Sequence, residues 1–237
     1  MIIINELLLD IKIYLLFIIV FYILLKFKKY IDVRKYYRNN RSYKEDSLIK
    51  KGEEGEVKVL KILDKFLLGG RLFHNVYIPI GKGKRTEIDL ILVNYYGIFV
   101  IESKNWTGSV IGLENDEKWI QEIDGNTYYR VNPCTQNNAH IKYLRRYLGV
   151  DRPIYYSIVV FGEESILVNK DKYGGYNSVI NLDELEGEMS LLTNSELLLY
   201  PKEVRKIGNK ISKYENQKDC VKLAHINRIK KINESIY

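Results

Sequence analysis

The chain is poor in cysteine and proline, and both shortages exclude whole classes of protein. Its two cysteines, Cys134 and Cys220, are too few for a small disulfide-stapled domain and are expected to be free thiols in a reducing compartment. Four prolines and no fixed repeat period exclude collagen-like and repeat architectures. The three histidines show no zinc-site spacing, and the turn at residues 81–84 lacks the spacing of a phosphate-binding loop.

Charge is distributed unevenly along the 237 residues. Residues 1–51 contain 11 basic and 5 acidic side chains, whereas residues 52–237 contain 26 and 25. The overall net charge of +7 therefore comes mainly from the front of the chain. A basic protein often binds nucleic acid, but here the basic excess follows an apolar stretch and needs a separate interpretation. The hydrophobic fraction of 46% is enough to fill a folded core.

The front of the chain has the pattern of a membrane anchor. Residues 13–25 are apolar without a break, and as a helix they would span about 20 Å of the roughly 30 Å hydrocarbon core. Extension back to residue 2 supplies the missing length. Basic residues follow the apolar run, which disfavours a cleaved signal peptide and places the later residues in the cytoplasm. We expect residues 1–26 to cross the cell membrane once; an in-plane helix and a buried soluble helix are the alternatives.

Residues 27–50 form a basic juxtamembrane linker. Its lysines and arginines are expected to attract anionic lipid headgroups, so that residues 1–41 as a whole contact the membrane. A nucleic-acid-binding arm is the alternative interpretation of the same charges. Beyond the linker we expect a domain over residues 51–165 and a strand and helical extension over residues 166–237 that packs on it.

Hydrophobic periodicity and turn residues predict a mixed α/β core with a mixed sheet and flanking helices. We expect the two glycines near residue 52 to begin the first helix, and Asn132 and Pro133 to cap and begin a later one. The predicted elements are a helix at 52–68, strands at 71–80, 86–93 and 98–101, two or three strands within 109–131, a helix at 133–148, a strand at 154–161 and helical stretches from 183.

Candidate catalytic residues lie at the ends of the apolar strands. Asp89 stands within an apolar run, where a carboxylate is costly unless a cation or a hydrogen-bond donor satisfies it. Glu102 and Lys104 are two residues apart after another apolar run, so both point to one face of a strand. Two carboxylates with a nearby lysine suit Mg²⁺ or Mn²⁺, which polarises phosphates and acidifies bound water. An ordinary salt bridge of Lys104 is the structural alternative.

Four sequence blocks, taken together, resemble the nuclease-related domain family, a member of the PD-(D/E)xK nuclease superfamily. The blocks are Gly52-x-x-Gly55-Glu56, then Glu87-Ile88-Asp89-Leu90-Ile91-Leu92-Val93, then Gly97-Ile98-Phe99-Val100-Ile101-Glu102-Ser103-Lys104-Asn105-Trp106-x-Gly108, and Asn132-Pro133-x-x-Gln136-x-x-x-His140. The resemblance covers residues 51–161, and the order and spacing of the blocks make it specific.

The resemblance implies a restriction-endonuclease-like core and metal-dependent hydrolysis of DNA or RNA phosphodiester bonds. It implies that Asp89 and Glu102 hold Mg²⁺ or Mn²⁺ with the carbonyl of Ser103, and that Lys104 is the catalytic lysine. Glu56 would complete the acidic cluster, directly or through water, and Gln136 would face the same site.

Several alternatives stay open at this stage. The domain could be a catalytically silent module that recruits nucleic acid or a protein partner to the membrane, because its own charge is nearly neutral. The anchor could also serve oligomerisation. His140 lies four residues after Gln136, so it shares a helix face with it and is expected to make a structural hydrogen bond. Trp106 and Trp119 are expected to be core or rim aromatics rather than base-stacking groups.

Overall fold

The computed structural model describes residues 47–169 and 177–215, and the side chains from residue 54 onward. The predicted membrane helix and the basic linker up to residue 46 lie outside these residues, as does Cys220. Within the described ranges, no helix combines the length and the apolar character needed to cross a bilayer.

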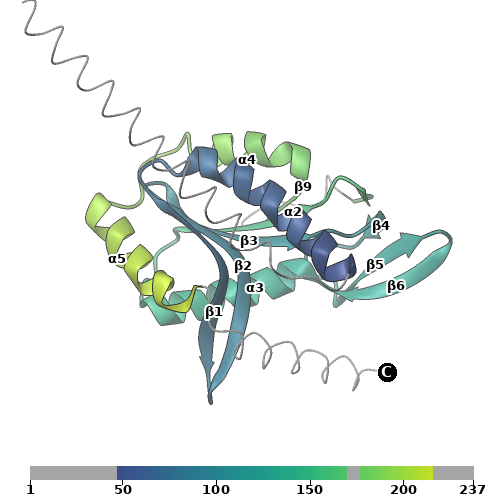
Figure 1. The fold of residues 1–237 in the computed structure, drawn as a ribbon, viewed down its shortest axis with the longest axis horizontal. Coiled ribbons are helices and arrows are strands. Elements are labelled where there is room, and N and C mark those ends of the chain that lie inside the picture. Colours follow the sequence, from purple (N-terminus) through teal and green to yellow (C-terminus); the bar gives the residue numbers. More distant parts are fainter. Residues whose placement is uncertain (1–46, 170–176, 216–237) are drawn as a thin grey trace, which may run out of the picture. The chain divides into compact units, whose positions relative to one another are not determined.

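The described chain is a mixed α/β structure, as its periodicity predicts (Figure 1). The helices are α2 (Ser47–Leu63), α3 (Pro133–Leu148), α4 (Leu185–Leu192) and α5 (Pro201–Ile211). The strands are β1 (Arg71–Gly81), β2 (Lys84–Asn94), β3 (Gly97–Lys104), β4 (Gly108–Ile111), β5 (Lys118–Ile123), β6 (Asn126–Val131), β7 (Tyr155–Phe161), β8 (Ser165–Leu167) and β9 (Asn177–Asn181). Short 3-10 turns lie at Asp64–Phe66, Leu182–Glu184 and Ser212–Tyr214.

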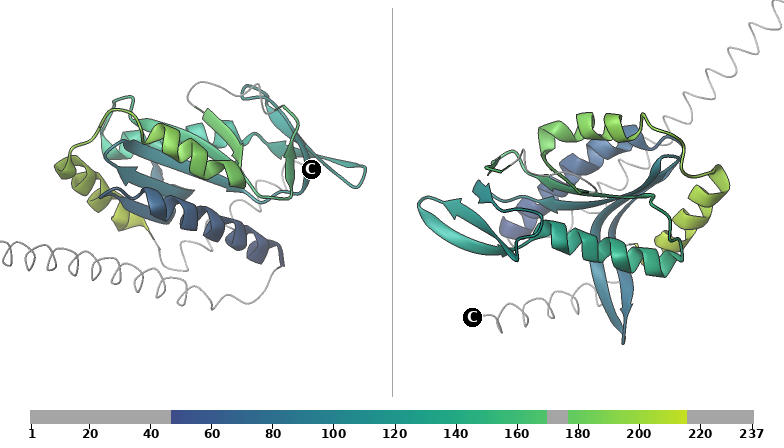
Figure 2. Two further views of the ribbon diagram at one scale, coloured as in Figure 1. Left: turned by 90° about the horizontal axis from the view of Figure 1, so that it is seen from above. Right: turned by 180° about the vertical axis from the view of Figure 1, so that it is seen from behind.

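The main sheet has the strand order β1-β2-β3-β7-β9. The first three strands are antiparallel, whereas β7 and β9 run parallel to β3. Helices α2 and α4 cover one face, and α3 covers the other with α5 beside it (Figures 1 and 2). The apolar residues of β2 and β3 are almost wholly buried because helices cover both faces.

A second sheet has the order β6-β5-β4-β8 and forms an arm at one end of the main sheet (Figure 1). Its anchor is Trp119, which is fully buried and stacks on Phe161 of β7 with ring centroids 5.9 Å apart. Strand β6 lies at the edge of this sheet and is exposed along its whole length. The prediction of a core role for Trp119 is confirmed.

The bounds of α2 and β3 differ from the sequence prediction. Helix α2 begins at Ser47 rather than at residue 52, so Gly52 and Gly55 lie inside the helix and do not begin it. The helix ends at Leu63, because the following 3-10 turn and the positive φ of Leu68 reverse the chain before the two glycines at 69 and 70. Strand β3 continues through Lys104, so Glu102 and Lys104 belong to the strand.

Helix α3 begins where the sequence predicts, and its cap is fully formed. The Asn132 side chain accepts hydrogen bonds from the backbone N–H groups of Cys134 and Thr135, at 2.8 and 3.3 Å. Its amide nitrogen donates to the backbone oxygens of Asp116 and Glu114, at 2.7 and 2.9 Å. The cap therefore ties the start of α3 to the loop between β4 and β5. This connection fixes the first turn of α3, and with it Gln136, beside the end of β3.

Candidate functional site

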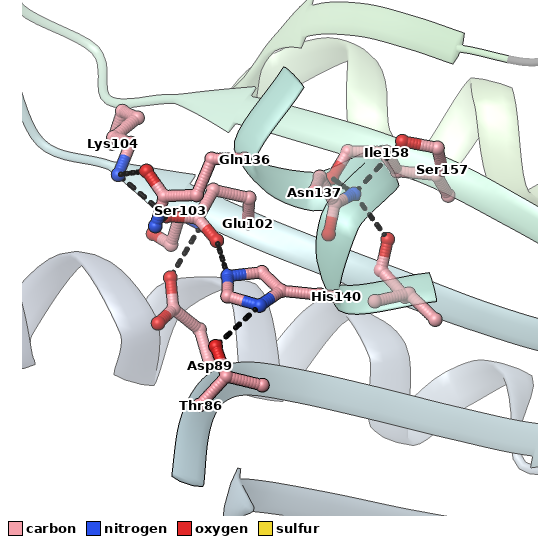
Figure 3. Close-up of polar contacts among 11 residues, drawn as sticks. Thr86, Asp89, Glu102, Ser103, Lys104, Gln136, Asn137, His140, Ser157 and Ile158 are labelled. Atoms are coloured by element: carbon pink, nitrogen blue, oxygen red, sulfur yellow. Dashed lines mark hydrogen bonds and ion pairs between the residues drawn. The ribbon is translucent and has the colours of Figure 1, made fainter. Parts of the chain in front are cut away.

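The candidate site lies at a fork between two neighbouring strands. The pairing of β2 with β3 ends at Leu90 and Ile101, and one step further Asp89 and Glu102 face each other across the widening gap. Strand β3 then pairs only with β7, with Glu102 beside Val159. The backbone N–H of Ser103 donates to Asp89 Oδ2 at 2.9 Å (Figure 3). A carboxylate thus serves as its acceptor at the point where β2 no longer pairs with β3. The fork thus brings two acidic side chains to one face of the sheet.

Glu102 is the centre of a dense polar network. It is 1% exposed, and its Oε1 accepts hydrogen bonds from Lys104 Nζ at 2.5 Å and from Gln136 Nε2 at 2.6 Å. Gln136 Oε1 in turn accepts from Lys104 Nζ at 3.2 Å, which closes a triangle (Figure 3). A buried carboxylate is tolerated only when such partners compensate for lost hydration. The network therefore holds Glu102, Lys104 and Gln136 in one fixed arrangement.

His140 contacts the other oxygen of Glu102. Its Nε2 lies 3.3 Å from Glu102 Oε2, and its Nδ1 lies 3.0 Å from Thr86 Oγ1. Within the described residues neither His140 Nε2 nor Glu102 Oε2 has a hydrogen-bond partner, so this 3.3 Å approach is a close contact, whereas the contact between His140 Nδ1 and Thr86 is a hydrogen bond. The prediction of a structural hydrogen bond for His140 fits this geometry. Thr86, at the start of β2, carries no sequence signal for this role.

The charges of the site fix the ionisation of its groups. Burial opposes ionisation of Glu102, but the ammonium of Lys104 and the imidazole of His140 outweigh it and lower the pKa of Glu102. Burial also disfavours the ammonium of Lys104, yet Glu102 and Asp89 outweigh it and raise the Lys104 pKa. Near neutral pH, Glu102 is therefore an anion and Lys104 a cation.

Asp89 has the opposite behaviour to Glu102. Burial and the negative charges of Glu102 and Glu56 raise its pKa well above the usual value, although Lys104 and the Ser103 N–H counteract them. Two carboxylates that face each other cannot both ionise cheaply without a cation between them. The charge of Asp89 is therefore less compensated by the protein than the charge of Glu102.

Glu56 approaches the site from α2. Its charge raises the pKa of Asp89 and of Tyr77 on β1, which places its carboxylate in the electrostatic neighbourhood of the fork. The neighbouring Gly55 is buried against Asn105, and a Cβ at this position would lie 3.2 Å from the Asn105 Cβ. The absence of a side chain at Gly55 therefore allows α2 to approach Asn105 closely.

The structure brings five of the six predicted site residues into direct hydrogen bonding: Asp89, Glu102, Ser103 through its backbone, Lys104 and Gln136. The sixth, Glu56, takes part through its charge. In residues 47–169 and 177–215 no three His, Cys, Asp or Glu side chains meet closely enough to form a ready metal cage. The salt bridge between Lys104 and Glu102 is present as well, so the structural alternative describes part of the same geometry.

A cavity of about 110 Å³ lies on the other side of β3, between α2 and the ends of β3 and β7. Ser103 and Asn105 line it, together with Gly55 and Lys58 of α2 and Gly162 after β7. Glu102 and Lys104 are not among its lining residues, because adjacent strand residues point to opposite faces. This cavity is therefore separate from the carboxylate network.

Comparison with known proteins identifies the domain that carries this site. The sequence model of the nuclease-related domain family matches residues 51–162, a segment that contains every candidate site residue. A curated relative, an uncharacterized protein of Bacillus anthracis, is 37% identical over 93 residues, which cover 39% of this chain and 44% of the relative. This chain thus spans less than half the length of that relative. No solved structure matches this chain. Residues 51–162 of this chain are therefore similar in sequence to the nuclease-related domain family.

Proposed function

We propose that this protein is a membrane-anchored nuclease of the PD-(D/E)xK superfamily that depends on a divalent metal ion and hydrolyses phosphodiester bonds of DNA or RNA. The observation that carries the proposal is the fork, where Asp89 faces Glu102 and Lys104 follows two residues later on the same face. The match of residues 51–162 to the nuclease-related domain family supports a nuclease-related function at the coarser level.

The donor set at the fork fits a hard divalent ion. Asp89 and Glu102 offer carboxylate oxygens, the chain at Ser103 offers a carbonyl, and Mg²⁺ and Mn²⁺ prefer oxygen ligands of these types. The charges of Asp89, Glu102 and Glu56 exceed the single positive charge of Lys104, so a cation would relieve the repulsion that raises the pKa of Asp89. When bound, the ion would supply Lewis-acid polarisation of the phosphate and acidify a water molecule.

The protein's own groups have separate roles in this proposal. Lys104 is held as an ammonium by its acidic neighbours, so it stabilises negative charge on the phosphate rather than accepting a proton. Gln136 holds both Lys104 and Glu102 by hydrogen bonds and is a positioning residue. His140 orients the second oxygen of Glu102 from the next turn of α3. Residues 1–26 would anchor the domain to the cytoplasmic face of the membrane.

The test uses the full chain, purified in a mild detergent because of its apolar front segment. We expect cleavage of labelled DNA or RNA with Mg²⁺ or Mn²⁺, none with EDTA, and loss of cleavage in Asp89→Asn and Lys104→Met. Titration calorimetry with Mn²⁺ should show binding that Asp89→Asn abolishes. The matched control is Lys58→Met, which removes a lysine paired with Glu163 at the surface. Cleavage that persists in both Asp89→Asn and Lys104→Met would refute the proposal.

A second candidate function is a catalytically silent module that binds nucleic acid at the membrane. It is favoured by the fact that Lys104, Gln136 and His140 already contact both oxygens of Glu102. Binding and cleavage of the same oligonucleotide separate the two candidates. A silent module would bind equally well with Mg²⁺ or EDTA and never turn over, whereas a nuclease would lose turnover and keep affinity in Lys104→Met.

A further inference from the structure

The hairpin of β5 and β6 presents an unusual surface close to the site. All six residues of β6 are exposed, including the large side chains of Tyr128, Tyr129 and Val131 at 43%, 67% and 65%. Edge strands usually carry features that discourage contacts, such as proline or inward-pointing lysine. An edge that instead displays two tyrosines and an arginine is typical of a binding surface.

Arg130 is held in a fixed orientation on this hairpin. Its guanidinium carbon lies 5.4 Å from the ring centre of Tyr128 and 6.0 Å from that of Trp106. Its Nε donates to Gln121 Oε1 at 2.9 Å, and the buried Gln121 is itself fixed by a 2.8 Å hydrogen bond to the Thr107 carbonyl. In the described part of the chain, the two terminal nitrogens of Arg130 donate to no protein acceptor. The guanidinium group of Arg130 is thus held in place, and its two terminal nitrogens can donate to an external acceptor.

This cluster lies next to the carboxylate network. Trp106 follows Lys104 by two residues, so their Cα atoms are within about 7 Å. Strand β6 also runs directly into α3, whose first turn carries Gln136 (Figure 1). Register places Tyr128 opposite Gln121 and Arg130 opposite Trp119, so both point to the side of the arm that packs on the domain. Tyr129, opposite Ile120, points to the other side.

We propose that Trp106, Tyr128 and Arg130 form a platform that holds a single-stranded segment of nucleic acid beside the fork. The proposal rests on the nuclease function proposed above and names its substrate class. The guanidinium group of Arg130 matches the two oxygens of a phosphate, and the exposed ring of Tyr128 and the half-buried ring of Trp106 can stack on bases that are not paired. Bases within a duplex keep their faces covered, so a stacking platform selects strands or regions that are already unpaired.

Binding is measured on the full chain in EDTA, where no turnover occurs, by the anisotropy of labelled single strands of roughly 12 nucleotides. We expect Tyr128→Ala to raise the Kd about fivefold or more, because base stacking on one aromatic ring is lost. Arg130→Gln should also raise the Kd and reduce the slope of log K against log salt by about 0.7, which is the loss of one phosphate contact. The same sequence as a duplex should bind more weakly.

Two control variants are matched to these changes. Tyr129→Ala removes the neighbouring and more exposed tyrosine from the opposite side of the hairpin. Arg145→Gln removes an arginine that also stacks at 5.4 Å from a tyrosine ring, that of Tyr155, at the far end of α3. Both should bind the single strand as the unaltered chain does. Equal losses in the controls and in the Arg130 and Tyr128 variants would overturn the platform.

A measurement on the unaltered chain covers the case in which a variant misfolds. The protein has two tryptophans, and Trp119 is fully buried, so stacking of bases at the platform should quench the fluorescence of Trp106. Saturating single strand without quenching would overturn the platform. Cleavage with normal binding by Arg130→Gln and Tyr128→Ala would defeat the platform and leave the nuclease proposal intact. If the unaltered chain bound single strands through the platform but did not cleave them, the nuclease proposal would fail and the platform would stand.

Discussion

Replacement of Lys104 by methionine tests the buried network most directly, because it removes the charge and keeps most of the aliphatic stem. Glu102 is 1% exposed and receives the Lys104 hydrogen bond at 2.5 Å. Removal of one partner from a buried ion pair costs about 3–5 kcal/mol when the remaining charge is uncompensated. Gln136 and His140 still contact Glu102, so we expect about 2–3 kcal/mol of lost stability.

Thermal unfolding of the full chain in EDTA measures this loss. For a domain of this size the expected decrease in Tm is roughly 5–10 °C. Lys58→Met is the matched control, because Lys58 lies 2.6 Å from Glu163 but the two side chains are 50% and 62% exposed. That surface pair should contribute less than about 0.5 kcal/mol. Equal Tm values for Lys104→Met and Lys58→Met would refute the reasoning, since burial would then make no difference.

The pH dependence gives an independent check. The lowered pKa of Glu102 contributes stability that is present above its unfolded value of about 4.3 and is lost as pH falls through the folded pKa. The raised pKa of Lys104 contributes stability below about pH 10.4 that is lost at higher pH. The deficit of Lys104→Met should therefore be full between these limits and shrink below about pH 4. Adding Glu102→Gln to Lys104→Met should recover part of the loss, because position 102 then no longer carries an unpaired buried charge.

Four further substitutions give distinct outcomes in the same thermal assay. Asp89→Asn should raise the Tm near neutral pH in EDTA. The pKa of Asp89 is raised, so its ionisation destabilises the fold as pH rises above about 3.9. A gain in Tm that persisted below this pH would contradict the stated cause. Trp119→Ala should cost about 3–5 kcal/mol, since the ring is fully buried against Phe161, and an unchanged Tm would show that the arm is not anchored there. Gly70→Ala should be strongly destabilising, because its Cβ would lie 1.9 Å from the Val93 carbonyl oxygen. Gly187→Ala, on the exposed face of α4, should instead increase the free energy of unfolding by about 0.5–1 kcal/mol. The reverse order of Tm values would be inconsistent with the backbone described.

Some charged side chains of the site stabilise the fold, and another destabilises it. Glu102 and Lys104 stabilise the fold and each other, whereas Asp89 is held beside a like charge at a cost. Destabilising groups of this kind concentrate at functional sites because a ligand or substrate provides the missing compensation. A cation at the proposed metal site would supply this compensation for Asp89, and the Mn²⁺ titration of Asp89→Asn tests whether one binds.

The sequence by itself determined the parts of this protein that depend on local chemistry. Alternation and apolar runs predicted β1, β2, β3 and β7, and the Asn132–Pro133 pair predicted the start of α3 to the residue. The order of the motif blocks was sufficient to indicate the nuclease-related domain, which the family match confirms. The strands and the helix cap depend on neighbours within a few residues, and the blocks are read directly along the chain, so all of these features can be inferred before any contact is known.

The family resemblance placed Gln136 at the same site as Glu102, but only the tertiary structure decided which atoms make contact there and that Thr86 and His140 take part. Gln136 and Glu102 are 34 residues apart, and Thr86 and His140 are 54 apart, so no local pattern pairs them. Likewise, the exposure of Tyr128 and the fixed orientation of Arg130 follow from β6 lying at a sheet edge beside Trp106. Long-range register and the burial of both sheet faces set these contacts, because they determine where each strand stops pairing and which side chain fills the gap.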